Sequence, residues 1–198
     1  MNKRLFLLLV FLPMVFITNV INAHGVEWKF DPAHSRIYFD VKHIYATVRG
    51  EFDDFSGKIS IDPKNYAVTD VSMQVRVESI DTGIQQRDNH LRTADFFNAP
   101  EFPLMKFESK TVEHISGDSY QVTGNLTIKD VTKEVTVPFT FLGVRDNPMD
   151  PKQMVAGYEG KFTLDRLAYN VGNGKFFEMG AVGRDVNVTL TFEVLTEK

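Results

Sequence analysis

Apolar and polar residues alternate along most of this chain, and this two-residue period limits the possible fold more than any other feature. The clearest segment, residues 71–78, reads Val-Ser-Met-Gln-Val-Arg-Val-Glu. Such alternation is typical of a β-strand with one buried face and one solvent-facing face. The same pattern occurs in segments 26–30, 37–43, 48–61, 105–109, 120–128, 135–141, 154–164 and 186–194. The chain is therefore predicted to be all-β, with eight or nine strands.

We expect these strands to form an eight-stranded antiparallel β-barrel, because short turns connect them and closure removes exposed sheet edges. A change of phase supports curvature: apolar residues stand at even positions up to Phe52 and at odd positions from Phe55. A β-bulge or sharp bend near Asp53-Asp54 would keep both sets inside the barrel. Pro138 has no N–H to donate, which predicts a local break or an edge in segment 135–141.

One long stretch, residues 79–109, interrupts the alternation. It contains a polar run at 85–90, then Phe96-Phe97, then two prolines. Its aromatic residues argue against disorder, so it is predicted to be a short helical crossing near residues 84–97 that packs over one end of the barrel. Phe96 and Phe97 would then cover the apolar interior. The polar cluster Arg87, Asp88 and His90 would either hold the crossing in place or meet a ligand head group.

The N-terminus reads as a targeting signal. Met1-Asn2-Lys3-Arg4 is basic, and residues 5–17 are almost wholly apolar. Because a membrane span needs about 20 apolar residues, this pattern favours a cleaved signal peptide at residues 1–23. Residues 24–198 would then form a single barrel domain. The expected location is a bacterial periplasm, with full secretion as the alternative.

Charge and cysteine content restrict stability and partners. The formal net charge of −4 becomes −6 when Lys3 and Arg4 are removed, and the chain has no cysteine. An exported protein without disulfide bonds must be stabilised by burial. An acidic chain without basic runs is a poor candidate for nucleic acid, and an anionic membrane surface would need a local patch.

The predicted inner faces are rich in phenylalanine, which makes up 17 of the 198 residues. They lack acidic and basic residues across six strands, and small residues such as Gly50, Gly124 and Gly160 lie among the large ones. A packed core and an apolar cavity that holds a hydrophobic chain are both compatible with this lining. The residues expected to line such a cavity are Phe39, Val41, Phe52, Phe107, Leu126, Phe139, Phe141 and Phe162.

Polar residues that could carry chemistry are few. No nucleophile motif surrounds Ser35, and the five histidines show no metal-ligand spacing. Buried hydrogen-bonding residues at one barrel end are the better interpretation, so no catalytic residue, metal site or cofactor is expected. The residues weighed were His34, Ser35, His43, Asp88, His90 and Arg166.

Several blocks, in order along the chain, resemble the YceI family. They begin with Trp28, continue through the 79–109 stretch and reach Gly172, so the resemblance covers essentially the whole of the expected mature chain. The blocks are Asp31-Pro32-Ala33-His34-Ser35, Gly50-Glu51-Phe52, Ser79-Ile80-Asp81-Thr82-Gly83, Arg87-Asp88-Asn89-His90-Leu91, Asp95-Phe96-Phe97, Gly124-Asn125-Leu126-Thr127-Ile128, Val131-Thr132-Lys133 and Arg166…Tyr169…Gly172.

The resemblance implies a lipocalin-like extended barrel with a helix and loop region at one end. It also implies a periplasmic or secreted protein that binds polyisoprenoids or related long-chain amphiphiles inside the barrel, without established catalysis. One block departs from the family pattern, because Leu167-Ala168 stands before Tyr169 where an acidic residue is common. Ligands vary within the family and include quinone-like and fatty-amide molecules, so the resemblance does not identify the ligand.

The leading hypothesis is a periplasmic carrier or sequestering protein whose partner is a hydrophobic small molecule, an isoprenoid or quinone-like lipid. Its tail would lie among the inner-face residues, and its head group would meet His43, Arg87, Asp88 or His90. One alternative is an enzyme that acts on such a lipid, with Asp88 and His90 in acid–base roles. Another is a non-binding envelope stress or interaction protein with a filled barrel. The oligomeric state, monomer or homodimer, stays open.

Overall fold

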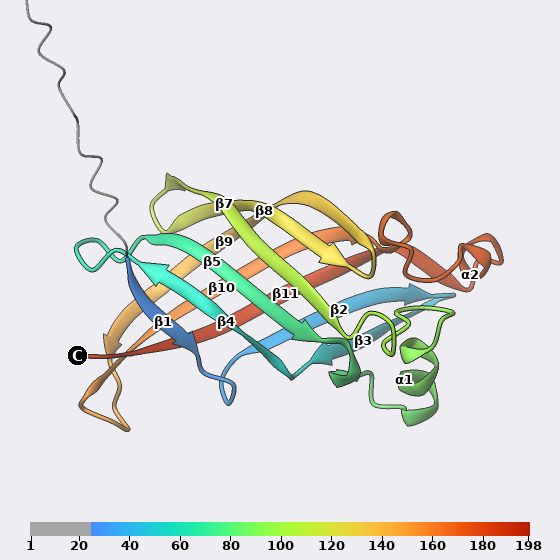
Figure 1. The fold of residues 1–198 in the computed structure, drawn as a ribbon, viewed down its shortest axis with the longest axis horizontal. Helices are drawn as coiled ribbons and strands as arrows, with labels where there is room; N and C mark the ends of the chain where they lie inside the picture. Colours follow the sequence, from blue (N-terminus) through green and yellow to red (C-terminus); the bar gives the residue numbers. More distant parts are fainter. Residues whose placement is uncertain (1–24) are drawn as a thin grey trace, which may run out of the picture.

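The computed structural model describes residues 25–198, and the expected signal peptide lies outside them. The described residues form a closed eight-stranded antiparallel barrel, as predicted (Figure 1). The pairing order is β1-β4-β5-β7-β8-β9-β10-β11, and β11 closes the barrel on β1. The strands are β1 Val26–Phe30, β2 Arg36–His43, β3 Ala46–Phe52, β4 Phe55–Ile61, β5 Val68–Arg76, β6 Ile80–Asp81, β7 Leu104–Ser116, β8 Ser119–Ile128, β9 Val131–Asp146, β10 Gln153–Asp165 and β11 Val182–Glu197.

Three of the eight barrel strands are interrupted, which is why the chain shows more strand segments than the barrel needs. β11 pairs first with β2 and then with β1, so β1 and β2 act as one broken strand. β3 and β4 together form the neighbouring barrel strand, since β3 pairs with β2 and β4 pairs with β1. They are separated at residues 53–54, where the change of phase predicted a break. The short 3-10 helix η1, Val77–Ser79, separates β5 from β6 in the same way.

β9 runs through Pro138 without a break. Pro138 is paired with Gln121 of β8, but the ladder between β9 and β10 ends one residue away, at Phe139 and Gly160. Pro138 therefore stands at a local edge, where its missing N–H costs no ladder hydrogen bond.

Several strands are also longer than the alternation indicated. The second half of β7 is mostly exposed, so polar residues there extend the ladder without an apolar face.

Helical segments and loops cover one end of the barrel (Figure 1). The predicted crossing is present as α1, Gln85–Arg92, followed by turns through residue 97. The 3-10 helix η2, Arg166–Tyr169, and the short helix α2, Lys175–Glu178, lie at the same end. No helix in the described part of the chain is long and apolar enough to cross a membrane.

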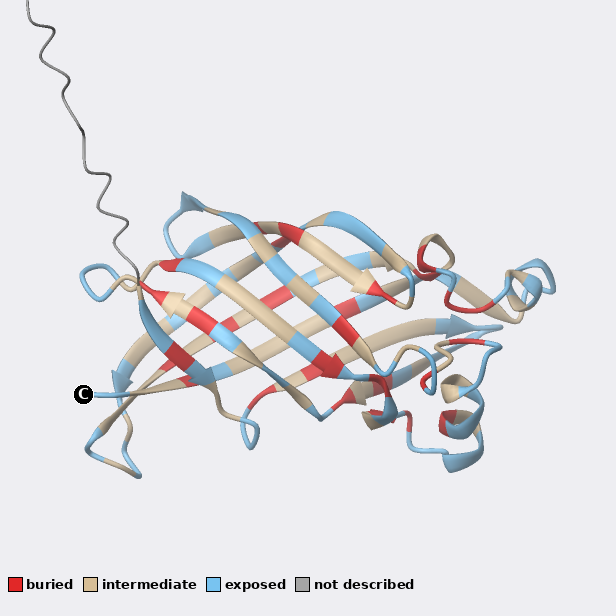
Figure 2. Ribbon diagram, in the orientation of Figure 1, coloured by how far each residue is buried: buried red, intermediate tan, exposed pale blue. Residues whose placement is uncertain are grey.

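The buried residues divide into two clusters, and buried positions alternate with exposed ones along the strands (Figure 2). The first lies near the helical end and includes Phe52, Phe96 and Tyr169. The second closes the opposite part of the barrel around Trp28, Ile61 and Val194, of which the last two are fully buried. The barrel interior is thus packed solidly at one end and covered by loops at the other.

Candidate ligand-binding cavity

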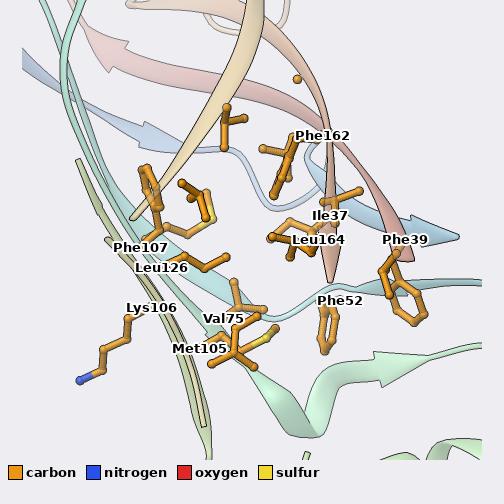
Figure 3. Close-up of a pocket in the computed structure, with 18 of the residues that line it drawn as sticks. Ile37, Phe39, Phe52, Val75, Met105, Lys106, Phe107, Leu126, Phe162 and Leu164 are labelled. Atoms are coloured by element: carbon orange, nitrogen blue, oxygen red, sulfur yellow. The ribbon is translucent and has the colours of Figure 1, made fainter. Parts of the chain in front are cut away.

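An apolar cavity of about 250 Å³ occupies the barrel interior. Its volume is just below the ~300–1,000 Å³ typical of small-molecule sites. Phe107 and Leu126 face Phe162 and Leu164 across it, whereas the side chain of Lys106 points away (Figure 3). All eight barrel strands contribute, and further wall residues are Phe30, Ile37, Ile59, Val75, Met105, Val122, Val135, Val137, Val186, Val188, Leu190 and Phe192.

The structure places seven of the eight predicted lining residues on this wall: Phe39, Val41, Phe52, Phe107, Leu126, Phe139 and Phe162. Phe141 is the exception. A register shift at Gly157-Tyr158 pairs Phe141 with Tyr158, and its ring packs on that tyrosine at 5.5 Å in the solid cluster. Alternation places Phe141 on the inner face but does not say where along the barrel the cavity ends. That any of these residues contacts a ligand stays a prediction.

The inner glycines shape the wall in an unexpected way. A Cβ atom on Gly50 would stand 2.3 Å from the ring of Phe39, and one on Gly124 would stand 2.7 Å from the ring of Phe107. Both glycines therefore let a phenylalanine ring lie flat against the neighbouring strand. They do not open space themselves, as the sequence suggested, but they keep two large rings out of the centre.

Three polar side chains of the wall are buried. Arg166 is 7% exposed, and its guanidinium donates to the backbone oxygens of Val171, Val182 and Gly183 at 2.7–3.1 Å. Among the described residues, no carboxylate forms an ion pair with it. Tyr158 and Tyr169 are 4% and 2% exposed, and neither hydroxyl has a hydrogen-bond partner in the described protein. Two residues of this hydrocarbon wall thus carry a buried hydroxyl without a partner among the described residues.

Burial controls the ionisation of these groups. Desolvation raises the pKa of both tyrosine hydroxyls, so they stay neutral donors at physiological pH. Desolvation also lowers the pKa of Arg166, against the opposing effect of Asp165, but an arginine remains charged. The tyrosines were missed as polar wall groups, although Tyr158 stands on a predicted inner face where phenylalanine dominates.

The side chains of the polar cluster predicted near the crossing bind other groups of the protein and do not line the cavity. Asp88 is 6% exposed and accepts hydrogen bonds from the backbone N and the hydroxyl of Thr82, at 2.9 and 2.5 Å. Arg87 donates to the hydroxyl and the carbonyl oxygen of the same threonine at 2.7 and 2.6 Å. These contacts hold the start of α1 against the end of β6. Of the two roles left open for Arg87 and Asp88, they match the structural one.

His90 has a different partner from Asp88, so the structure does not bring the two together as an acid–base pair. Its exposed ring donates to Asp95 at 2.8 Å and packs edge-on against Phe96 at 5.1 Å. Phe96 and Phe97 do line the cavity, where the crossing covers it. His43 is exposed at the end of β2 and lies outside the wall.

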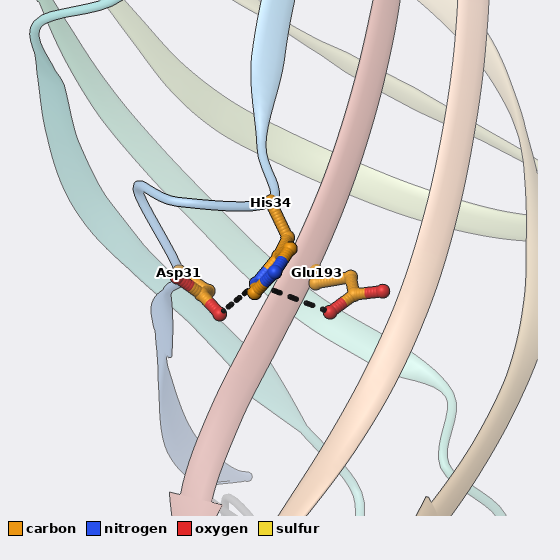
Figure 4. A group of neighbouring side chains, drawn as sticks. All are labelled: Asp31, His34 and Glu193. Atoms are coloured by element: carbon orange, nitrogen blue, oxygen red, sulfur yellow. Dashed lines mark hydrogen bonds and ion pairs between the residues drawn. The ribbon is translucent and has the colours of Figure 1, made fainter. Parts of the chain in front are cut away.

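A second polar group joins Asp31, His34 and Glu193 on the outside of the barrel (Figure 4). Its potential ligand atoms lie within 4.8 Å of one another. His34 Nδ1 stands 2.8 Å from Asp31 and 3.9 Å from Glu193, and the hydrogen bond to Asp31 raises the pKa of His34. The fully buried Ser35 exchanges two hydrogen bonds with the backbone of Glu193. Together these contacts close the turn between β1 and β2.

Known proteins share this architecture and much of this sequence. The family model described as a YceI-like domain matches residues 28–194. A UPF0312 protein from Pseudomonas aeruginosa is 34% identical over 174 residues, covering 86% of this chain and 87% of the relative.

Two solved structures show the same fold. BcnA from Burkholderia cenocepacia superposes with a TM-score of 0.71 at 27% identity, over 84% of this chain and 99% of its own. A polyisoprenoid-binding domain from Saccharophagus degradans superposes with a TM-score of 0.61 at 13% identity, over 84% and 97%. With the family match spanning nearly all the described residues, this protein belongs to the YceI family.

Proposed function

We propose that this protein binds one long-chain amphiphile, of the isoprenoid or quinone-like class, inside the barrel and carries or sequesters it. The observation that carries the proposal is the continuous hydrocarbon wall to which all eight strands contribute. Burial of apolar surface contributes ~25 cal/mol per Å², so a lipid tail would gain several kcal/mol from this wall alone. The polyisoprenoid-binding domain that shares the fold supports the choice of ligand class.

We place the ligand head group near Arg166 and Tyr169, and not at the residues first considered. His43 lies outside the wall, His90 is exposed, and Arg87 and Asp88 are occupied by Thr82. Arg166 by contrast is a buried cation with N–H groups to spare, and the hydroxyl of Tyr169 has no partner among residues 25–198. A carbonyl or phosphate oxygen would accept hydrogen bonds from both.

The decisive experiment identifies the ligand directly. Protein isolated under native conditions is extracted, the extract is analysed by mass spectrometry, and uptake of added prenyl lipid or quinone is measured. Leu126→Trp places a larger ring in the cavity and should abolish uptake. Asn125→Trp, on the outer face of the same strand, is the matched control. Absence of lipid from the wild-type protein, together with no uptake, would refute the proposal. Turnover of the bound lipid would instead favour the enzyme.

We further propose that the protein acts in the periplasm after cleavage of residues 1–23. The basic start and the apolar run at 5–17 support this. Cell fractionation and mass spectrometry of the N-terminus test it: a mature chain that begins at His24 is expected in the periplasmic fraction. A chain that retains Met1 in the cytoplasm would contradict the proposal.

A further inference from the structure

Two loops at the helical end of the barrel expose large apolar side chains next to each other. Tyr45 and Ile44 form the turn between β2 and β3 and are 95% and 58% exposed. Phe177 lies in α2 and Met179 follows it, and they are 41% and 68% exposed. The backbone N–H of Ile44 donates to the carbonyl of Ala181 at 3.1 Å, which joins the loops. We call these four residues the tip patch.

The tip patch adjoins the cavity. Val41 and Val182 both line the cavity wall. Val41 lies three residues before Ile44, and Val182 follows Ala181 directly. The strands that carry them are paired, since Val182 stands opposite His43. The two exposed loops therefore continue directly from a pair of strands that line the cavity wall.

The turn that carries Ile44 and Tyr45 is unfavourable for these residues. His43 pairs with Ala46, so the hairpin loop has two residues, and Ile44 has a φ of +53°. Glycine or asparagine is the usual residue there, because a β-branched side chain is strained at positive φ. Folding alone would not favour isoleucine and tyrosine at this turn. Their exposure at such a position indicates a role for the side chains outside the fold.

The charge near the tip patch is opposite to that of the whole protein. Residues 42–45 and 175–185 contain Lys42, Lys175 and Arg184 against Glu178 and Asp185, so their formal charge is +1 in a chain of −4. Arg184 is also paired with Asp165, and it lies 5.8 Å from the ring of Phe177. Basic side chains beside exposed aromatic and aliphatic ones suit a surface with anionic head groups over an apolar interior.

We propose that the tip patch docks on an anionic lipid bilayer. Docking places the nearby end of the cavity close to the membrane. The ligand is then taken from that membrane or delivered to it. This inference rests on the proposed lipid-binding function. Ile44, Tyr45, Phe177 and Met179 enter the interface between head groups and acyl chains. Lys42 and Lys175 contact the head groups.

Vesicle binding tests the docking surface. The protein is used as isolated from cells after mass spectrometry shows its N-terminus, because an uncleaved apolar run would itself bind vesicles. Vesicles of phosphatidylcholine with phosphatidylglycerol are sedimented with wild type, with Tyr45→Ser/Met179→Ser and with Met149→Ser. Met149 is 90% exposed in the β9–β10 loop at the opposite end of the barrel. The double variant should bind about tenfold or more weakly, and Met149→Ser as the wild type does.

Ile44→Gly separates a membrane role from a structural one. It removes an apolar side chain and also relieves the strained turn, so vesicle binding should fall while the midpoint of thermal unfolding stays equal or rises. A variant that unfolds more easily and binds vesicles as well as the wild type would show that Ile44 serves the fold. Equal vesicle binding by the wild type and the tip-patch variants would overturn the proposal.

A delivery comparison keeps this inference distinct from the proposed function. A prenyl quinone is supplied either from dilute ethanol or from the same vesicles. Tip-patch variants should take it up normally from ethanol and at least tenfold more slowly from vesicles. If no protein takes it up by either route while the variants still lose vesicle binding, the lipid-binding proposal fails and the docking surface stands. Equal rates from vesicles for all variants would refute the docking role.

Discussion

At the scale of single residues, the informative side chains are those whose polar atoms have no partner in the described part of the chain. Tyr158 and Tyr169 belong to the cavity wall, and their buried hydroxyls form no hydrogen bond with the residues that the structure describes. A buried polar group left unsatisfied costs ~1–3 kcal/mol, which a phenylalanine would avoid. Tyr158 belongs to the cluster that closes the barrel, whereas Tyr169 lies with Arg166 near the loops. A ligand oxygen at either place would remove that cost.

Tyr158→Phe should therefore stabilise the ligand-free protein. The expected gain is up to ~1 kcal/mol, which corresponds to roughly 2–4 °C in the unfolding midpoint of a domain of this size. Tyr38→Phe, on the outer face of β2, is the control and should change little. A clear loss of stability in Tyr158→Phe would show that the hydroxyl has a partner in the folded protein.

The pair Asp31 and His34 should give the fold a small pH dependence. Hydrogen bonding to Asp31 raises the pKa of His34 above 6.5, and the hydrogen bonds from His34 and Ala33 outweigh partial burial and hold the pKa of Asp31 below 3.8. The pair is intact between these two reference values. Its contribution is lost as pH rises through the raised pKa of His34, and as pH falls through the lowered pKa of Asp31.

NMR titration of the imidazole of His34 measures this effect. The midpoint should lie above 6.5 in the wild type and move down towards 6.5 in Asp31→Asn, because the carboxylate charge is lost. His34→Gln should remove the matching pH dependence of stability above neutral pH. An unchanged midpoint in Asp31→Asn would assign the shift to Glu193 instead.

At the scale of elements, the covered end of the barrel depends on contacts between loops. Asp88 and Arg87 tie α1 to Thr82, and Arg92 donates to the carbonyl oxygens of Glu78 and Ile80. Lys129, in the turn after β8, donates to the carbonyl oxygens of Phe96 and Asn170 at 3.0 and 2.7 Å. This single amine links the crossing to the segment that contains Arg166. The cover is thus one hydrogen-bonded unit.

Asp88→Ala should loosen this unit by ~2–3 kcal/mol, since it removes two hydrogen bonds to a buried carboxylate. Chemical denaturation measures the loss, and hydrogen exchange should show faster opening of α1 than of β10. Gln86→Ala, at an exposed position of the same helix, is the control. If Asp88→Ala kept full stability but lost ligand uptake, the carboxylate would act on the ligand.

At the scale of the whole molecule, the barrel is solid at one end and hollow in the middle. The solid cluster around Trp28 supplies stability in a chain without disulfide bonds. In the hollow part, the rings of Phe39 and Phe107 lie against Gly50 and Gly124. Empty apolar space forfeits dispersion contacts, so a ligand that fills it should stabilise the entire barrel.

Removal of bound lipid should lower the unfolding midpoint, and added lipid should restore it. A ligand present at 100 times its Kd contributes about 2.7 kcal/mol, or roughly 5–10 °C for a domain of this size. Calorimetry at several lipid concentrations measures the shift. Leu126→Trp should unfold at a midpoint that does not depend on lipid, whereas Asn125→Trp should behave as the wild type. A shift of equal size in both variants would place the lipid outside the barrel.

The period of two determined most of the architecture by itself. It predicted an antiparallel barrel, the break at Asp53-Asp54 and the inner faces, because alternation records which side of each strand is buried. The loss of alternation in residues 79–109 predicted α1. The full lengths of β7 and β9 were not predicted, because the exposed parts of these strands pair through backbone hydrogen bonds and need no apolar face.

The tertiary structure decided where polar and apolar groups meet along the barrel. Alternation gives the face of a residue but not its depth, so Phe141 was expected on a cavity wall that it does not reach. In the same way, Arg87, Asp88 and His90 are near neighbours in sequence, yet Thr82 holds the first two and Asp95 holds the third, all outside the cavity. Arg166, Tyr158 and Tyr169 come from later segments and reach the wall only because the barrel closes. Closure of the barrel brings segments that are far apart in the sequence into contact. The alternation of apolar and polar residues does not show which segments will meet.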